Sequence, residues 1–187
     1  MCHLRRSFRG TAKLLPSGQL CQNRAPYSRM HDPSGFSLIE LLIVVAIILV
    51  IAAIAIPNLL RARIASNEAS AVGSLRALNA AQINYESTYP TVGYATALPA
   101  LAGTSCTPPG ATGACLIDTL LAAGRKSGYS FSLTGTSGTP NATYQLIAVP
   151  LTPNQTGVRY FCSFADAVVR VSGTAISTCD GTISALQ

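Results

Sequence analysis

The stretch "GFSLIELLIVVAIILVIAAIAIP", residues 35–57, is almost wholly apolar, yet it carries one carboxylate, Glu40, near its start and a proline, Pro57, at its end. Residues 36–56 are about as many as the ~20 that an α-helix needs to cross a bilayer. A charged side chain within the apolar layer costs roughly 2.5–3.5 kcal/mol on insertion scales unless it is paired. The stretch therefore predicts a membrane-length helix and raises the question of which group pairs with Glu40.

Charges on the two sides of this stretch predict its orientation. The chain has 13 Lys and Arg residues and 7 Asp and Glu residues. The basic residues before the stretch are opposed by Asp32 alone, whereas basic and acidic residues nearly balance after it. The positive-inside rule then predicts a cytoplasmic N-terminus and an exported C-terminal domain. Because the downstream part is nearly neutral, the overall charge of +6 does not indicate a nucleic-acid partner.

Residues 1–35 are polar, basic and rich in Ser, Gly and Pro. They contain no apolar core, so they do not form a signal peptide that is cleaved after its hydrophobic region. We interpret them as a leader peptide. Met30 is a second possible start, which would shorten the leader to "MHDPSG".

After Pro57 the apolar pattern continues as a stripe at steps of three and four residues, which predicts that the helix continues to about Tyr85. The stripe consists of Ile64, Ala71, Val72, Leu75, Leu78 and Tyr85. We expect a transmembrane segment over residues 36–57 and an amphipathic half over 58–88, with Pro57 loosening or kinking the helix without ending it. Fifty helical residues measure ~75 Å, which exceeds the thickness of a membrane, so the second half must pack on something else.

The composition changes again in the last hundred residues. Residues 89–127 are expected to form a variable loop, with one short helix in "LIDTLLAAG". Residues 128–187 contain four β-like runs, "GYSFSLTG", "ATYQLIAVPL", "VRYFCSF" and "AVVRVSG". The sequence therefore predicts an α+β fold, in which an antiparallel meander packs against the amphipathic half of the long helix.

The hexapeptide "GFSLIE", residues 35–40, followed by Pro57, resembles the cleavage motif of the type IV pilin and type II secretion pseudopilin family. The resemblance is strong over residues 35–90. Beyond them only the general arrangement is similar, namely a variable loop, a small antiparallel sheet and two cysteines near the C-terminus. It implies a pilin-like fold, cleavage between Gly35 and Phe36 by a prepilin peptidase, and methylation of the new Phe36 amine by the same processing machinery.

The family also implies a partner for Glu40. Phe36 and Glu40 are four residues apart, on one face of a helix. In the family the corresponding glutamate pairs with the new amine, commonly that of a neighbouring subunit, and we expect the pair to set the axial register of the assembly. The alternative from the residues alone is an ordinary signal anchor that tolerates a glutamate near the membrane surface.

The exported part lacks the residues of a common hydrolase. Both histidines, His3 and His31, precede the expected cut, so the processed chain has no histidine base. The cysteine spacings do not match a C-x-x-C zinc pattern and favour two local disulfides, Cys106–Cys115 and Cys162–Cys179. The alternative is that some of these cysteines are free and buried. No enzyme activity, cofactor or metal is predicted.

Two further patterns allow two interpretations each. The acids Asp118, Asp166 and Asp180 suggest a calcium site, but they lack alternating ligand spacing, so roles in turns or on the surface are favoured. The tripeptides "NAT" at Asn141 and "NQT" at Asn154 fit the glycosylation sequon, which also arises by chance in a Thr-rich chain.

The resemblance implies a structural subunit of a helical filament. Its expected partners are copies of itself, the peptidase and methyltransferase, an assembly platform in the inner membrane, and membrane lipid before assembly. Its expected location is the inner membrane as a single-pass precursor, and then the periplasm and the cell surface as a filament. The alternatives are a type II secretion pseudopilin and a membrane-anchored periplasmic binding module that does not polymerise.

Overall fold

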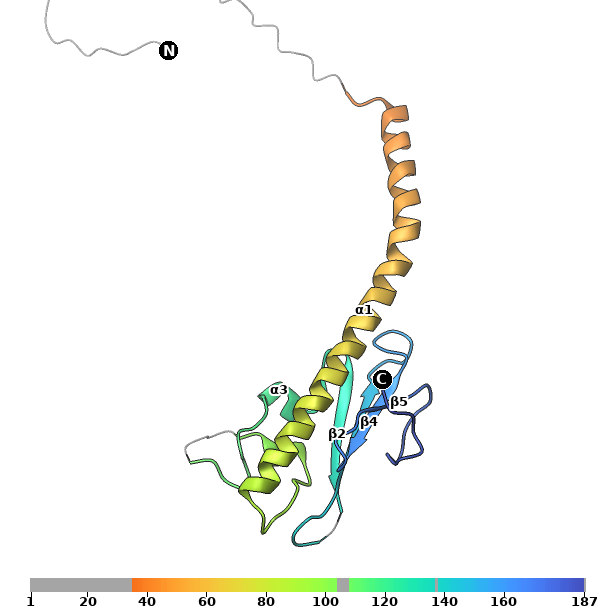
Figure 1. Cartoon of the computed structure of the whole chain (residues 1–187). Coiled ribbons are helices and arrows are strands. Elements are labelled where there is room, and N and C mark those ends of the chain that lie inside the picture. Colours follow the sequence, from red (N-terminus) through yellow and green to blue (C-terminus); the bar gives the residue numbers. More distant parts are fainter. Residues whose placement is uncertain (1–34, 104–107, 137, 187) are drawn as a thin grey trace, which may run out of the picture. The chain divides into compact units, whose positions relative to one another are not determined.

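The computed structural model describes residues 35–103, 108–136 and 138–186 (Figure 1). The chain divides within its first helix, after Leu42, into two compact units. The elements in chain order are α1 (Leu38–Thr88), α2 (Leu98–Leu101), α3 (Thr119–Ala122), β1 (Arg125–Lys126), β2 (Tyr129–Gly135), β3 (Tyr144–Pro150), β4 (Tyr160–Phe164) and β5 (Arg170–Ser172).

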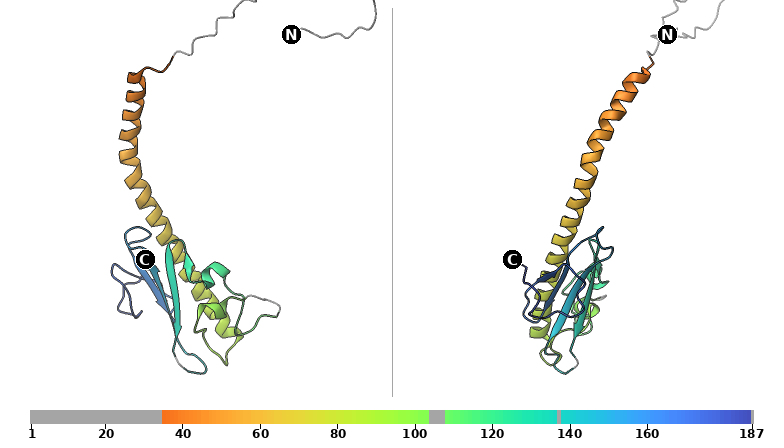
Figure 2. Two further views of the ribbon diagram at one scale, coloured as in Figure 1. Left: turned by 180° about the vertical axis from the view of Figure 1, so that it is seen from behind. Right: turned by 90° about the vertical axis from the view of Figure 1, so that its right-hand side faces the viewer.

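Helix α1 is one continuous element of 51 residues that contains Pro57, which confirms the single long helix. Proline lacks an N–H group, so the carbonyl of Ala53 has no partner four residues ahead. Helix α1 curves along its course but does not break (Figures 1 and 2). A local loss of one hydrogen bond is tolerated because the helical bonds on either side remain.

The five strands form one antiparallel sheet in the order β1-β2-β3-β4-β5, so each strand pairs with its neighbours in sequence. This topology is the predicted meander. The β2–β3 register places Phe131 opposite Ala148, and the β3–β4 register places Ile147 opposite Cys162. Strand β1 was not predicted, because two residues are too short to carry an alternating pattern.

The second half of α1 packs against one face of the sheet, and the two further views show the helix and the strands as adjacent layers (Figure 2). The helix contributes Ala71, Val72, Leu75, Leu78, Ala81 and Tyr85 to the core. The strands contribute Tyr129, Phe131, Leu133, Tyr144, Leu146, Ala148 and Phe161. The predicted apolar stripe is therefore the packed face, except that Ile64 is only half-buried.

The connection between α1 and the sheet holds two short helices. Helix α3 lies within the predicted helical run, and it is capped by Asp118, whose Oδ1 accepts the N–H of Leu121 at 2.6 Å. Gly124 follows α3 with φ of 72°, and an added Cβ would lie 2.9 Å from the Phe131 carbonyl oxygen. Glycine is needed there for both reasons. Helix α2 has a proline in its first turn and was not predicted.

The disulfide between Cys162 and Cys179 is present and joins β4 to the C-terminal segment, with a Cα–Cα distance of 5.9 Å. This part of the cysteine prediction is confirmed. The other predicted pair, Cys106–Cys115, involves Cys106, which lies outside the described residues, and it stays a prediction.

Candidate processing and assembly site

The predicted cleavage point lies in non-helical chain just before α1. Gly35 and Phe36 are both exposed, and Phe36 is 85% exposed. A Cβ added at Gly35 would meet no atom of the described residues within 4 Å. The fold itself therefore does not require glycine at this position, and a requirement for glycine would have to come from a protein that binds this segment.

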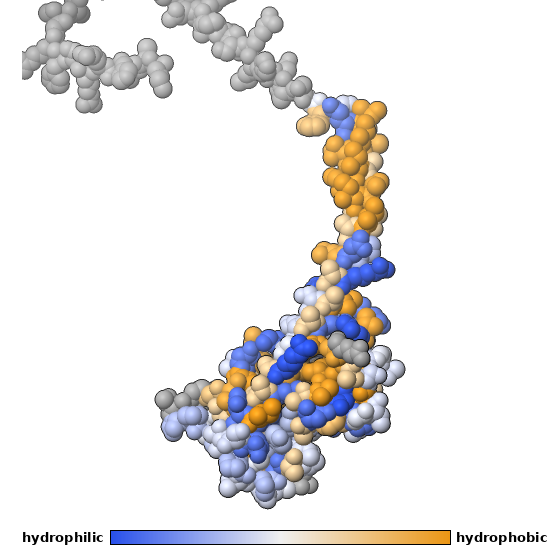
Figure 3. All heavy atoms as spheres, viewed as in Figure 1, coloured by the Kyte–Doolittle hydropathy of each residue, from blue (hydrophilic) through white to orange (hydrophobic). Residues whose placement is uncertain are grey.

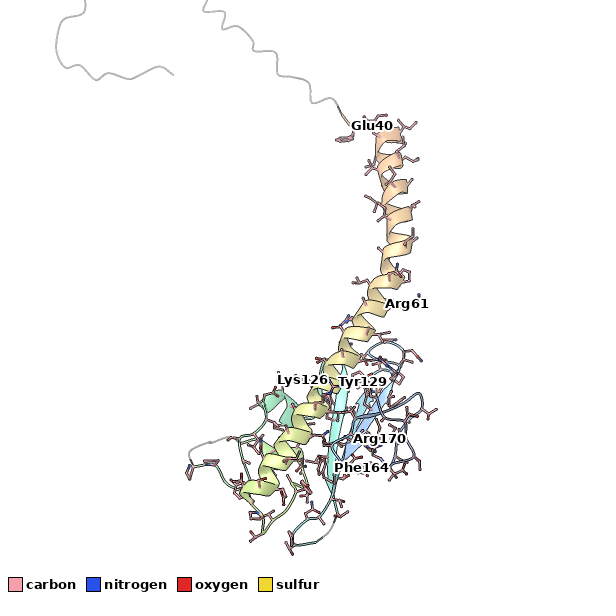
Figure 4. All side chains as sticks on the ribbon, in the orientation of Figure 1. Glu40, Arg61, Lys126, Tyr129, Phe164 and Arg170 are labelled. Atoms are coloured by element: carbon pink, nitrogen blue, oxygen red, sulfur yellow. A yellow bond between two sulfur atoms is a disulfide. The ribbon has the colours of Figure 1, made fainter. Side chains whose placement is uncertain are left out.

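Glu40, which is labelled in Figure 4, lies in the first turn of α1. Its Oε2 accepts the backbone N–H of Ser37 at 3.0 Å. This is one half of a capping box, in which a glutamate in the first turn reaches back to the residue that precedes the helix. The Ser-x-x-Glu spacing is visible in the sequence, but the sequence analysis missed it.

The capping bond uses one carboxylate oxygen. Among the described residues, the other oxygen, Oε1, has no hydrogen-bond partner. A carboxylate can accept several hydrogen bonds, so Glu40 can cap its own helix and also bind a cation on another chain. The helix dipole favours a negative charge at this end, which adds to the stability of the cap.

The first half of α1 presents an apolar surface. Its large hydrophobic residues from Leu38 to Leu60 are 46% to 80% exposed, and they form the orange band in Figure 3. Helix α1 is long and apolar enough to cross a membrane, and none of its most apolar stretch is buried. A contiguous apolar surface of this size requires lipid or protein around it.

Glu68 anchors the other half of α1 to the sheet domain, and it is only 5% exposed. Its Oε1 accepts the backbone N–H groups of Val158 and Arg159 at 2.9 and 3.1 Å. Its Oε2 accepts the Nε–H of Arg159 at 2.7 Å. Burial would raise the pKa of Glu68, but these hydrogen bonds and the nearby guanidinium outweigh it and hold the pKa below its usual value.

Asn79 is a second buried polar anchor on α1. Its Nδ2 donates to the Ser163 hydroxyl and to the Ala167 carbonyl at 2.9 and 3.0 Å, and its Oδ1 accepts the Tyr144 hydroxyl at 3.1 Å. Burial raises the pKa of Tyr144 to about 12, so this hydroxyl remains a donor at neutral pH.

Gln82 is the third anchor and bonds twice to the backbone of Ala95, donating to its carbonyl at 3.0 Å and accepting its N–H at 2.9 Å. With Glu68 and Asn79, it fixes where the domain sits along α1. The sequence analysis identified the apolar stripe but missed all three anchors, because polar residues in an amphipathic helix are normally solvent-exposed.

The three acids considered for calcium have local partners. Asp118 pairs with Lys126 at 3.1 Å as well as capping α3, and Asp180 accepts the N–H of Thr182. Asp166 pairs with Arg170 at 2.6 Å, and that guanidinium also lies 4.3 Å from the centre of the Phe164 ring (Figure 4). Within residues 35–103, 108–136 and 138–186, no three metal-ligating side chains gather.

The two sequon asparagines have different environments. Asn141 is 3% exposed, its Nδ2 donates to the Tyr94 carbonyl, and its Oδ1 accepts from Thr136. A glycan cannot be attached to this nitrogen without breaking the packing. Asn154 is exposed, in a turn with φ of 64°.

Comparison with known proteins gives partial matches. A family model described as the prokaryotic N-terminal methylation motif matches residues 30–56. The type IV wide pilus major component PilA4 of Thermus thermophilus is 59% identical over 39 residues, which are 21% of this chain and 30% of that protein. The type IV major pilin protein PilA of Myxococcus xanthus is 51% identical over 51 residues, 27% of this chain and 23% of that protein.

The matches thus span less than a third of either relative, and no solved structure matches the chain significantly. A methylation motif, an exposed apolar helix and a small sheet packed on the second half of that helix together give a pilin-like fold. Over these partial matches the chain is similar to type IV pilins.

Proposed function

We propose that this chain is the precursor of a structural subunit of a type IV pilus-like helical filament. The observation that carries the proposal is the combination of an exposed apolar α1 with Glu40 in its first turn, directly after the expected cut. An apolar helix alone would suit any membrane anchor. The carboxylate at its start caps the helix with one oxygen, and its second oxygen can bind a cation that is brought to it.

Cleavage between Gly35 and Phe36 supplies that cation. In this proposal a prepilin peptidase binds the exposed, non-helical segment, cuts it, and leaves an α-amine on Phe36, which is then methylated. Methylation adds apolar surface and keeps the positive charge. The accessibility of both residues supports this step.

During assembly the apolar half of α1 leaves the lipid and packs against copies of itself. The ammonium of Phe36 on one subunit then binds the free oxygen of Glu40 on the next. Because a buried charge is tolerated only when paired, this contact selects one axial register among the many that an apolar helix allows. The precursor resides in the inner membrane with a cytoplasmic N-terminus, an assembly platform extracts it, and the filament lies outside the cell.

A structural role without catalysis fits the relatives, which are pilus components by name. A pseudopilin of a type II secretion system and a non-polymerising binding module are the competing roles. The experiment is to shear the cells and analyse the released filaments for this chain by mass spectrometry. Its presence as a main filament protein supports the proposal. Recovery in the membrane fraction alone favours the binding module.

A further inference from the structure

Two arginines, Arg61 and Arg63, follow the apolar half of α1 and are both exposed. Figure 4 labels Arg61 on α1, on the domain side of the apolar half. Neither residue forms an ion pair or a hydrogen bond with another side chain in the described part of the chain. Lys126, Arg159 and Arg170, by contrast, each bind an acid. The two guanidinium groups are therefore free to bind a partner outside the chain.

Their distance from the apolar run suggests that partner. The run from Leu38 to Ile56 rises ~28 Å at 1.5 Å per residue, close to the ~30 Å of hydrocarbon in a bilayer. Arg61 and Arg63 lie about 7 and 10 Å beyond its end. Side chains on a helix tilt toward its N-terminus, which here is toward the membrane. Both guanidinium groups consequently reach into the layer of lipid headgroups.

The two residues also point in different directions. A separation of two residues on a helix turns the side chains by about 200°, so they lie on roughly opposite sides of α1. They do not compete for one ligand. Each can bind a separate phosphate with two parallel hydrogen bonds, the arrangement for which the planar guanidinium is suited.

We propose that Arg61 and Arg63 bind the phosphate groups of anionic phospholipids on opposite sides of α1 and so set the depth of the anchored subunit. These phospholipids lie in the membrane leaflet on the side of the sheet domain. Zwitterionic lipids bind less well, because their own cation offsets the phosphate charge. This inference rests on the membrane-anchored state in the proposed function, but not on polymerisation.

The test is lipid retention by the full-length protein, purified in detergent with added phosphatidylglycerol or phosphatidylcholine and measured by native mass spectrometry. The variant is Arg61→Gln with Arg63→Gln. The matched control is Arg76→Gln, because Arg76 is also exposed on α1 and without an ion-pair partner in the described chain, but lies ~20 Å further along the helix. Circular dichroism checks that each variant remains folded.

We expect wild-type protein to retain more phosphatidylglycerol than phosphatidylcholine. The double variant should retain at least about fivefold less phosphatidylglycerol than wild type. Arg76→Gln should stay within about twofold of wild type, since the attraction fades with distance from the membrane. Equal retention of the two lipids by wild type, an unchanged double variant, or an equal loss in Arg76→Gln would each overturn the inference.

This result is independent of filament formation. A chain that binds lipid through the two arginines but never appears in sheared filaments would contradict the proposed polymerisation and leave the lipid site intact. Flotation of the full-length protein with vesicles of the same lipids tests the membrane anchor itself. A chain that does not float would contradict both the proposed function and the lipid site.

Discussion

Glu68 and Arg159 form an ion pair with 2.7 Å between Oε2 and Nε, although 91 residues separate them in sequence. The Glu68 side chain is 6% exposed and that of Arg159 is 50% exposed, so the carboxylate is the buried member. Its second oxygen binds the backbone of the β3–β4 connection. The pair therefore ties that connection to α1 where the helix enters the domain.

The first prediction concerns this pair and its dependence on pH. Glu68→Gln keeps an oxygen for the two N–H groups but places an amide N–H group against the Arg159 guanidinium. We expect a loss of about 1–3 kcal/mol in the free energy of unfolding at pH 7. The measurement is urea unfolding of the full-length chain in detergent micelles. Glu86→Gln is the control, because Glu86 forms no ion pair in the described chain, and it should change stability by less than about 0.5 kcal/mol.

The pH dependence has a definite sign. The folded-state pKa of Glu68 lies below its usual value of 4.5, so the stability it contributes is present above that value and is lost as the pH falls through the lower, folded pKa. The difference between wild type and Glu68→Gln should therefore shrink between pH 7 and pH 3. A difference that stays constant or grows on acidification would contradict a charged Glu68 in the folded domain.

The second prediction separates the two roles of Glu40. Glu40→Ala removes both the cap on Ser37 and the charge, whereas Glu40→Gln keeps an oxygen for the cap and removes only the charge. Breaking a buried ion pair by removing one partner costs roughly 3–5 kcal/mol, repeated at every subunit. Both variants should insert into the membrane and yield almost no filament. The measurement is the ratio of sheared-filament to membrane-fraction protein. Normal filaments from Glu40→Gln would show that the ion pair is not needed, and a simultaneous loss of filaments in Glu40→Ala would show that the cap is.

The third prediction concerns processing. The N-terminal peptide of mature protein should begin at Phe36 and carry a methyl group on its amine, as mass spectrometry can establish. Gly35→Val should remain folded, because a Cβ at Gly35 meets no atom of the described residues within 4 Å. It should stay uncut, because the expected cleavage motif has glycine before the cut. Mature peptides that still contain Ser34 and Gly35 would refute the cleavage site.

The fourth prediction concerns the cysteines. The Cys162–Cys179 bond closes a loop with a sequence separation of 17, and the chain-entropy model assigns about 3 kcal/mol to a loop of this size. The Cys162→Ser, Cys179→Ser double variant should lose about that much in urea unfolding. Non-reducing peptide mapping should also yield a Cys106–Cys115 link. A dominant link between Cys106 and Cys162 would contradict both assignments.

The fifth prediction concerns the buried network around Asn79. Asn79→Ala leaves the Tyr144 and Ser163 hydroxyl groups without their partner, and each unsatisfied buried group costs about 1–3 kcal/mol. We expect a total loss of about 2–4 kcal/mol in unfolding experiments. Asn84→Ala, at an exposed position on α1, is the control and should be nearly neutral. Equal effects of the two substitutions would show that the network contributes nothing.

Several features of this protein follow from local sequence alone. A long apolar run predicts a helix because only a helix satisfies its backbone within lipid. The stripe at Ala71, Leu75 and Leu78 predicts the packed face, and alternation at Tyr129, Phe131 and Leu133 predicts a half-buried strand. The Cys162–Cys179 pair was predictable because its members are close in sequence. These patterns repeat over short distances, so they can be recognised without the fold.

Other features depend on the tertiary structure. Glu68, Asn79 and Gln82 occupy positions that an isolated helix would expose, and each is buried because a residue distant in sequence meets it. The burial of Asn141 likewise depends on a loop from Tyr94. A polar side chain is buried only where complementary donors and acceptors surround it. That environment is assembled by chain segments far apart in sequence, so hydropathy and spacing decide the elements, and the packed domain decides which polar residues hold them together.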